Sequence, residues 1–398
     1  MSVSKETILH HATGLKGEVI RLRRHFHMHP ELSYRENDTA AYIRGWLDRN
    51  HIPFRSGIAG TGIIATITGN GSGSRVVAAR AELDALPIHE RNDAEYKSVN
   101  EGVMHACGHD AHMAMLMGTA LVMKSLKDSF GGSLLLIFQP GEEKSPGGAR
   151  LMIESGELTN PKPDLIIAQH ILPELETGKA GYRAGRYMAS CDELYITVTG
   201  RGGHAALPGL TTDQVYIASQ LVVRLKDRMR EKQASAGIPT VLGIGRISGE
   251  GATNVIPEKV EIAGTFRTFD EKWRREALSF IRDIAAETAA GSGVTIDVRI
   301  EEGYPVLVND ESLTRQAVEL SRELLGDDKA EMLDTRMSSD DFSFYSSLAP
   351  SLYYRIGIRK KDAEMKKLHT SDFDLDEDAL VTGVANLSWL ISGFLRTV

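Results

Sequence analysis

Residues 104–112 of the 398-residue chain concentrate side chains that bind metal ions. The segment reads Met-His-Ala-Cys-Gly-His-Asp-Ala-His and contains Cys107, one of only two cysteines in the chain, and His109. In an extended segment these two side chains point the same way, and Gly108 between them lets the backbone adjust to a cation. Thiolates and imidazoles are common metal ligands, so the segment predicts a metal site. The alternative is a buried structural cysteine among surface histidines.

A helix is predicted directly after this segment. The run from residue 111 to residue 124 reads as a helix, which places Cys107 and His109 at or just before its N-terminus. The helix dipole favours negative charge at that end, and therefore the thiolate form that binds a metal.

Further polar residues lie beyond the C-terminal ends of predicted strands. They are Asp84 after residues 75–81, Glu142 and Glu143 after residues 133–138, His170 after residues 164–168, and His369 after residues 352–356. In open α/β sheets ligands bind in the crevice outside these strand ends. We therefore expect side chains that are distant in sequence to converge there with Cys107 and His109.

Apolar periodicity predicts an α/β fold for most of the chain. Helical spacing covers residues 5–28 and 37–50. The strands at residues 62–67, 75–81, 133–138 and 164–168 are almost continuously apolar. That pattern is typical of a central, mostly parallel sheet covered by helices on both faces.

The pattern changes between residues 187 and 303. Strands at 193–199, near 240–247 and 259–267, and at 294–300 alternate with helices at 211–230 and 271–290. The order β-α-β-β-α-β is that of a ferredoxin-like α+β module. Because helix and strand signals resume after residue 310, we expect a discontinuous catalytic, metal-binding domain at 1–186 and 304–398. A lid or dimerisation domain is then inserted at 187–303.

Composition limits the partners and the compartment. A net charge of −8 and a pI near 5.9 argue against general binding to nucleic acid or to an anionic membrane. Two cysteines are too few for a disulfide framework, and a metal-binding thiolate favours a reducing compartment, so we expect the cytoplasm. Residues 1–32 are charged throughout, and no segment reaches about 18 continuous apolar residues, so neither an export signal nor a membrane span is expected.

Seven blocks across nearly the whole chain resemble the signature blocks of one family, in that family's order. It is the metal-dependent amidohydrolase family of hippurate hydrolase, N-acyl-amino-acid deacylases and plant auxin-conjugate hydrolases, related more distantly to carboxypeptidase G and aminoacylase. The resemblance implies a zinc-peptidase-like catalytic domain and a hydrolase acting on linear amides. The blocks are AELDALP at 81–87, HACGHDAH at 105–112, FQPGEE at 138–143, GGH at 202–204, TNVIP at 253–257, GTFR at 264–267 and LH at 368–369.

The resemblance also implies a role for each matching residue. Glu142 matches the general base, and Asp84 matches a carboxylate that supports the ligands without binding metal itself. His204 resembles a lid-domain histidine that reaches into the partner subunit's site, which implies a homodimer through the lid domain. Asn254 and Arg267 resemble binders of the substrate carboxylate. The ligands to two divalent cations match Cys107, His109, Glu143, His170 and His369.

The residue types suit amide hydrolysis. Adjacent Glu142 and Glu143 can point in different directions, so that one binds a metal while the other takes a proton from water; a solvated surface pair is the alternative. His204 could stabilise the oxyanion, or be a surface histidine. Arg267 offers a rigid fork for a carboxylate, or a surface salt bridge. Asn254 could equally stabilise a turn.

The residue types constrain the identity of the metal ion and of the substrate's acyl group less than they constrain the reaction. Thiolate and imidazole favour Zn²⁺, and carboxylates in a dinuclear site suit Mn²⁺ as the second choice. The expected substrates are N-acetyl, N-benzoyl or similar N-acyl amino acids, with a dipeptidase or carboxypeptidase as the alternative. An inactive homologue that only binds metal or ligand is disfavoured, because a pure binder has no need of a free base such as Glu142.

Three positions depart from the family's pattern. Glu82 stands where aspartate is usual, Gly141 stands where alanine is common, and Asp340 stands where glutamate is usual. The longer Glu82 is expected to shift the packing near Asp84, and the shorter Asp340 to alter the pocket wall near His369. These departures bear on substrate preference more than on activity.

Overall fold

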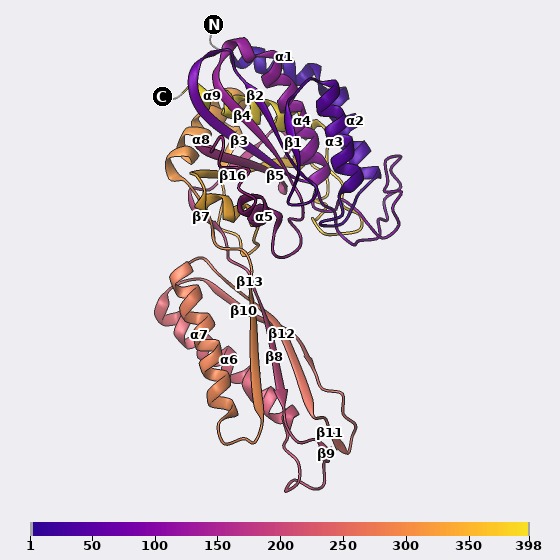
Figure 1. The fold of residues 1–398 in the computed structure, drawn as a ribbon, viewed down its shortest axis with the longest axis vertical. Helices are drawn as coiled ribbons and strands as arrows, with labels where there is room; N and C mark the ends of the chain where they lie inside the picture. Colours follow the sequence, from indigo (N-terminus) through magenta and orange to yellow (C-terminus); the bar gives the residue numbers. More distant parts are fainter. Residues whose placement is uncertain (1–2, 397–398) are drawn as a thin grey trace. The chain divides into compact units, whose positions relative to one another are not determined.

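The structure is a computed structural model that describes residues 3–396, and the chain forms two compact units (Figure 1). The larger unit comprises the described parts of residues 1–185, 308–334 and 341–398, and the smaller unit comprises residues 186–307 and 335–340. Residues 335–340 lie outside the inserted segment that the sequence predicts. Backbone hydrogen bonds tie this segment to the smaller unit, because Ala189 donates to the carbonyl of Arg336 and Arg336 donates to that of Tyr187.

The larger unit is built on one mixed sheet. Its strands are β1 (Phe54–Ile58), β2 (Gly62–Thr68), β3 (Gly71–Glu82), β4 (Gly131–Gln139), β5 (Leu165–Glu176), β6 (Ala180–Tyr182), β15 (Ala330–Met332) and β16 (Ser351–Arg359). Over the described residues these eight strands take the order β1-β2-β4-β3-β5-β16-β6-β15. The central strands β4, β3, β5 and β16 are parallel, and antiparallel pairs lie toward the edges. The predicted α/β class with a mostly parallel sheet is confirmed.

Helices cover both faces of this sheet (Figure 1). They are α1 (Lys5–Gly14), α2 (Lys16–Met28), α3 (Asn37–Arg49), α4 (His109–Ser125), α5 (Gly148–Glu154), α8 (Glu311–Leu325), α9 (Asp378–Arg396) and the 3₁₀ helices η1 (Lys127–Ser129), η2 (Asp327–Lys329) and η3 (Asp341–Ser347). On one face, α4 and α9 share an apolar core with Ala79 of β3. The next residue, Arg80, points to the opposite face, where it bonds Asp341 of η3.

Two predicted helix boundaries are wrong. The helix predicted over residues 5–28 is divided into α1 and α2 at Leu15, whose backbone has φ −91° and ψ 0°. The helix predicted from residue 111 begins at His109, because Gly108 adopts a left-handed conformation that turns the chain there.

The last helix, α9, is long and apolar enough to cross a membrane by length and composition. In the structure 83% of its apolar window is buried inside the protein. Its residues belong to the same core cluster as those of α4 and the central strands, so α9 is a core helix of the larger unit.

The smaller unit is an antiparallel sheet with two helices. Its elements are β8 (Asp192–Thr199), α6 (Gln214–Ala236), β10 (Thr240–Ser248), β12 (Lys259–Thr268), α7 (Glu271–Ala289) and β13 (Thr295–Glu302), in the predicted β-α-β-β-α-β order. The sheet order is β10-β12-β8-β13, and both helices pack on one apolar core. Two-stranded sheets pair β9 (Gly203–His204) with β11 (Val255–Ile256) and β7 (Gly185–Met188) with β14 (Leu307–Asn309).

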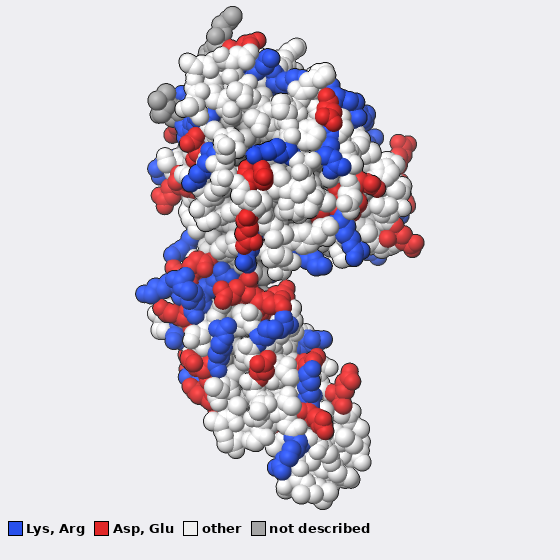
Figure 2. Space-filling view, in the orientation of Figure 1, with Lys and Arg blue, Asp and Glu red and all other residues white. Residues whose placement is uncertain are grey.

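Charged side chains of both signs are interspersed over the visible face of the protein, whereas the end of the smaller unit that carries β9 and β11 is mostly uncharged (Figure 2). Large apolar side chains are exposed in this region. Leu207 and Leu210 in the loop after β9 are 51% and 68% exposed, and Val255 of β11 is 46% exposed. The helix that follows, α6, exposes Tyr216 and Val223. Each of these residues exposes an apolar side chain on the smaller unit, and together they are called its apolar surface below.

Candidate metal centre

A left-handed turn at Gly108 directs Cys107 and His109 toward strand β5. Gly108 has φ +80°, and a Cβ atom there would lie 2.1 Å from Cδ1 of Ile171, so both the conformation and the space require glycine. The extended conformation assumed for this segment is therefore wrong, since the chain turns at Gly108 and His109 is already helical. Both side chains nevertheless reach the same cluster of donor atoms.

The structure brings the five predicted ligands together. Cys107 Sγ lies 3.5 Å from His170 Nε2, and Glu143 Oε1 lies 3.3 Å from His369 Nε2. His109 Nε2 lies 4.0 Å from an oxygen of Glu142. Among the described residues, potential ligand atoms lie within 4.8 Å of one another in four groups. They are Cys107 with Glu143 and His369, His109 with Glu142 and Glu143, His109 with Glu82, His112 and His170, and Glu142 with Asp340 and Asp341.

The buried imidazoles are oriented to offer a lone pair to this cluster. His109 Nδ1 lies 2.8 Å from the carbonyl oxygen of Asp84, and His170 Nδ1 lies 2.8 Å from that of Ile171. A carbonyl only accepts, so each Nδ1 carries a hydrogen, and each Nε2 offers its lone pair to the cluster when the ring is neutral. Buried His109 Nε2 and Glu143 Oε1 have no hydrogen-bond partner among the described residues. Glu143 Oε1 does face His369 Nε2 at 3.3 Å, and buried ligand-type atoms left without a hydrogen bond fit a divalent cation.

The carboxylate of Asp84 binds the backbone of the two glutamates. Its carboxylate accepts the backbone N–H groups of Glu142 and Glu143 at 3.1 and 3.0 Å, and the hydroxyl of Ser33 at 2.6 Å. Burial alone would raise the pKa of Asp84, but the hydrogen bonds from His109, Ser33 and Glu143 outweigh it and lower this pKa. Asp84 is therefore an anion whose oxygens are used to hold the loop after β4.

The charges around the cluster favour a cation. Burial lowers the pKa of His109, but Glu82, Asp84 and Glu143 outweigh burial and raise it to about 10. Burial and the carboxylates of Glu143 and Glu142 raise the pKa of the Cys107 thiol well above its usual value. The helix N-terminus alone therefore does not produce the expected thiolate, and a bound cation would be needed to stabilise it.

His170 and His369 lie in segments that the sequence only partly predicts. β5 continues beyond residue 168 to Glu176, so His170 lies inside the strand, in register with Arg355 of β16. His369 lies in the loop after β16, with φ 61°. Its backbone N–H donates to the carbonyl of Ala106 at 2.8 Å, which ties this loop to the Cys107 segment, and 51% of its side chain is exposed.

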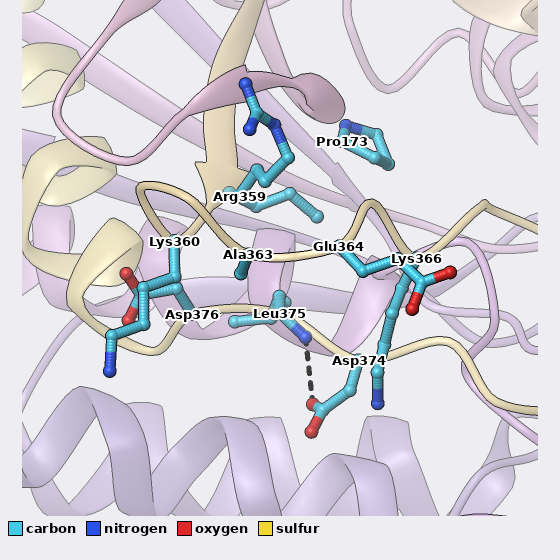
Figure 3. Close-up of a pocket in the computed structure, with 10 residues that line it drawn as sticks. Pro173, Arg359, Lys360, Ala363, Glu364, Lys366, Asp374, Leu375 and Asp376 are labelled. Carbon is cyan, nitrogen blue, oxygen red and sulfur yellow. Dashed lines mark hydrogen bonds between the residues drawn. The ribbon is translucent and has the colours of Figure 1, made fainter.

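A hollow of about 210 Å³ lies beside the loop that carries His369 (Figure 3). Its walls include Lys366 before His369, Asp374 and Leu375 after it, and Pro173 of β5. The N–H of Leu375 donates to the carboxylate of the neighbouring lining residue, Asp374, at 2.9 Å. Of the described lining residues, none is a predicted ligand, so the hollow is distinct from the donor cluster.

The sequence interpretation missed a buried polar network around Glu82. Glu82 accepts from His112 Nδ1 at 2.8 Å and also bonds Arg80. Arg80 in turn donates to Gln139 at 2.9 Å and to Asp341 at 2.6 Å. The available signal was the presence of Arg80 and Glu82 within an otherwise apolar strand, because charges in such a strand are buried only with partners.

The three predicted residues of the smaller unit lie at two places within it. His204 is exposed on β9, and Asn254 is exposed in the turn before β11, where its carbonyl accepts the N–H of Ala205 at 2.9 Å. Arg267 lies near the other end of β12, partly buried, and its Nη1 donates to the carbonyl of Met337 at 3.1 Å and to Ser339 Oγ at 3.3 Å.

Comparison with known proteins places this chain among metallohydrolases. Residues 78–392 match peptidase family M20/M25/M40. The chain is 40% identical over 308 residues to an N-acyl-L-amino acid amidohydrolase of Geobacillus stearothermophilus, covering 77% of this chain and 82% of that relative. It is 35% identical over 371 residues to thermostable carboxypeptidase 2 of Saccharolobus solfataricus, covering 92% of each.

A solved structure agrees with this similarity over almost the whole chain. The crystal structure of a dinuclear metal-binding peptidase of the M20 family from Bacillus subtilis has a TM-score of 0.82 and 30% identity, covering 97% of this chain and 100% of that chain. The match thus extends over both units and the donor cluster. This chain belongs to peptidase family M20/M25/M40, as a metallohydrolase that acts on amide or peptide bonds.

Proposed function

We propose that the protein hydrolyses N-acyl amino acids to a carboxylic acid and a free amino acid. The observation that carries the proposal is the position of Glu142, a buried carboxylate beside the predicted ligands whose backbone N–H is held by Asp84. A carboxylate placed next to such ligands suits general base catalysis. The similarity to an N-acyl-L-amino acid amidohydrolase supports an acyl substrate.

Cys107, His109, Glu143, His170 and His369 would hold two divalent cations, with Zn²⁺ as the first choice and Mn²⁺ as the second. When bound, such cations lower the pKa of water and polarise the carbonyl of the scissile amide. Buried His109 Nε2 and Glu143 Oε1, which make no hydrogen bond to described residues, support this assignment.

In this proposal Glu142 moves the proton. It takes a proton from the attacking water, whose oxygen forms the new bond to the carbonyl carbon. It then gives that proton to the amide nitrogen as the carbon–nitrogen bond breaks. Asp84 fixes the backbone of both glutamates, so Glu143 can serve as a ligand while Glu142 keeps its base role.

The smaller unit would bind the substrate's carboxylate. Arg267 uses only Nη1 in its hydrogen bonds to described residues, which leaves the Nε and Nη2 edge for bidentate capture of a carboxylate. His204 Nδ1 accepts the N–H of Ala206 at 3.1 Å, so Nε2 carries the hydrogen when the ring is neutral and could donate to an oxyanion. Asn254 lies next to His204 and away from Arg267, so we propose that it contacts the substrate together with His204.

We propose further that the protein is a homodimer through the smaller unit, in which His204 serves the partner subunit's site. The apolar surface formed by Leu207, Leu210, Val255, Tyr216 and Val223 supports a second copy as its occupant. Mixing a His204→Ala chain with a Glu142→Gln chain tests this proposal. Restored activity in the mixture is expected, because one of the two composite sites then has both residues intact. No recovery after confirmed subunit exchange would contradict it.

The activity is tested with metal-stripped protein to which Zn²⁺ or Mn²⁺ is returned. Release of free amino acid is measured from N-acetyl and N-benzoyl amino acids and from dipeptides. Metal-dependent turnover of the acyl compounds is expected. Turnover of dipeptides alone would instead establish the peptidase alternative, which the similarity to a carboxypeptidase favours.

A Glu142→Gln variant tests whether Glu142 acts as the general base and not as a metal ligand. The amide keeps the size of the side chain but cannot accept the proton, so turnover is expected to fall by at least about 100-fold while metal content is retained. The content is measured by elemental analysis of the dialysed protein. Turnover equal to that of the unaltered protein would exclude Glu142 as the base.

A further inference from the structure

We infer that His112 is a positioning residue for the metal site, because it links Glu82 to Ile171 and thereby fixes the imidazole of His170. This inference rests on the proposed function, since it takes His170 as a metal ligand. It concerns a histidine for which neither the sequence analysis nor the proposed mechanism has a role.

Ile171 lies beyond the end of the pairing between β3 and β5, which explains why a side chain such as His112 is needed to bond its backbone. The pairing of β3 with β5 ends at Arg80 and Ala168, so Ile171, three residues further along β5, has no partner on β3. Ile171 is completely buried, and an unpaired backbone group there would be costly. Side chains take the place of the missing strand at this point.

Two histidines satisfy the backbone of Ile171. Its N–H donates to His112 Nε2 at 3.0 Å, and its carbonyl accepts from His170 Nδ1 at 2.8 Å. Arg355 also donates to this carbonyl at 3.4 Å. The direction of the His170 ring is therefore set by the carbonyl of Ile171, and the position of Ile171 is set in part by His112.

The hydrogen-bond directions fix the tautomer of His112. A backbone N–H can only donate, so His112 Nε2 must present its lone pair to Ile171. His112 Nδ1 then carries the hydrogen and donates it to Glu82 at 2.8 Å. Glu82 is held in turn by Arg80, so the arrangement is anchored on the charged network inside the sheet.

These contacts separate the role of His112 from that of a ligand. His112 lies in the same group of potential donors as His109 and His170, but both of its ring nitrogens are already bonded. His170 differs, because its Nδ1 bonds the carbonyl of Ile171 while its Nε2 contacts another predicted ligand, Cys107 Sγ, at 3.5 Å. Ile171 also packs against Gly108, between the ligands Cys107 and His109, so a shift of Ile171 would disturb both sides of the site.

The test is the affinity of metal-stripped protein for Zn²⁺, measured by competition with a chromophoric chelator. His112→Phe keeps the ring's bulk but removes both hydrogen bonds, and a loss of about 10- to 100-fold in affinity is expected. His112→Gln keeps an oxygen that can accept from Ile171 but loses the link to Glu82, so a loss near tenfold is expected.

His105→Phe is the matched control. His105 belongs to the same segment and is equally buried, but neither of its ring nitrogens has a hydrogen-bond partner among the described residues. Wild-type Zn²⁺ affinity is expected for this variant. Melting of the metal-free variants is measured in parallel, because a purely structural role for His112 would lower the melting temperature without changing the affinity of the folded protein.

The outcomes distinguish this inference from the proposed function. If the unaltered protein binds no Zn²⁺ or Mn²⁺, the proposed function fails. If it binds metal and folded His112→Phe binds Zn²⁺ as tightly as His105→Phe does, the positioning role is refuted. If His112→Phe does not fold, His112→Gln decides, and an unchanged affinity in that variant would overturn the inference.

Discussion

Replacing Asp84 by asparagine tests whether one buried carboxylate holds the loop after β4 in place. Asparagine has the same shape but only one acceptor oxygen, so a backbone N–H of Glu142 or Glu143 would lose its partner. Losing a hydrogen bond to a charged group costs about 1.5–3 kcal/mol, and leaving a buried donor unpaired costs about 1–3 kcal/mol more. We therefore expect Asp84→Asn to lower the free energy of unfolding by about 2.5–6 kcal/mol.

The assay is urea unfolding of metal-free protein followed by circular dichroism, because removing metal separates the loop's own stability from cation binding. Ser33→Ala is the control. It removes only the hydroxyl that donates to Asp84 and leaves both backbone N–H groups paired, so a loss of about 1–2 kcal/mol is expected. An Asp84→Asn variant no less stable than Ser33→Ala would refute this reasoning.

Three further predictions address the turn, the pH dependence and the metal. Gly108→Ala is expected to destabilise the metal-free protein by about 2–4 kcal/mol in urea unfolding, because the backbone has φ +80° and the new methyl would overlap a side-chain carbon at 2.1 Å. Burial lowers the pKa of His27, but Asp110 and Glu90 outweigh burial and raise it above 6.5. The stabilisation from protonated His27 is therefore complete below about pH 6.5 and is lost as the pH rises through the folded-state pKa. The urea midpoint of the metal-free protein should fall between pH 6 and pH 8, and it should fall less in the His27→Gln variant. Adding Zn²⁺ to metal-free protein at about 1,000 times its dissociation constant should stabilise the fold by about 4 kcal/mol, and an unchanged melting temperature would exclude a tightly bound cation.

The fold was predictable where local pattern and tertiary environment agree. The apolar runs of β3, β4 and β5 read as buried strands because both faces of the sheet are covered, and the smaller unit was predictable because its strands and helices follow one another in a simple order. The break at Leu15 was not, because the apolar spacing continues across it. The extension of β5 through His170 was not either, because it depends on pairing with β16.

By itself the sequence determined the donor types and their order along the chain, and the resemblance of seven blocks to one family implied a hydrolytic metal site. Only the tertiary structure decided which atoms face one another. The turn at Gly108, the orientation of His109 by a backbone carbonyl, and the contact of His112 with Ile171 depend on segments that are distant in sequence. A hydrogen bond between such segments leaves no periodic pattern in the chain, because it is set by where two folded elements meet.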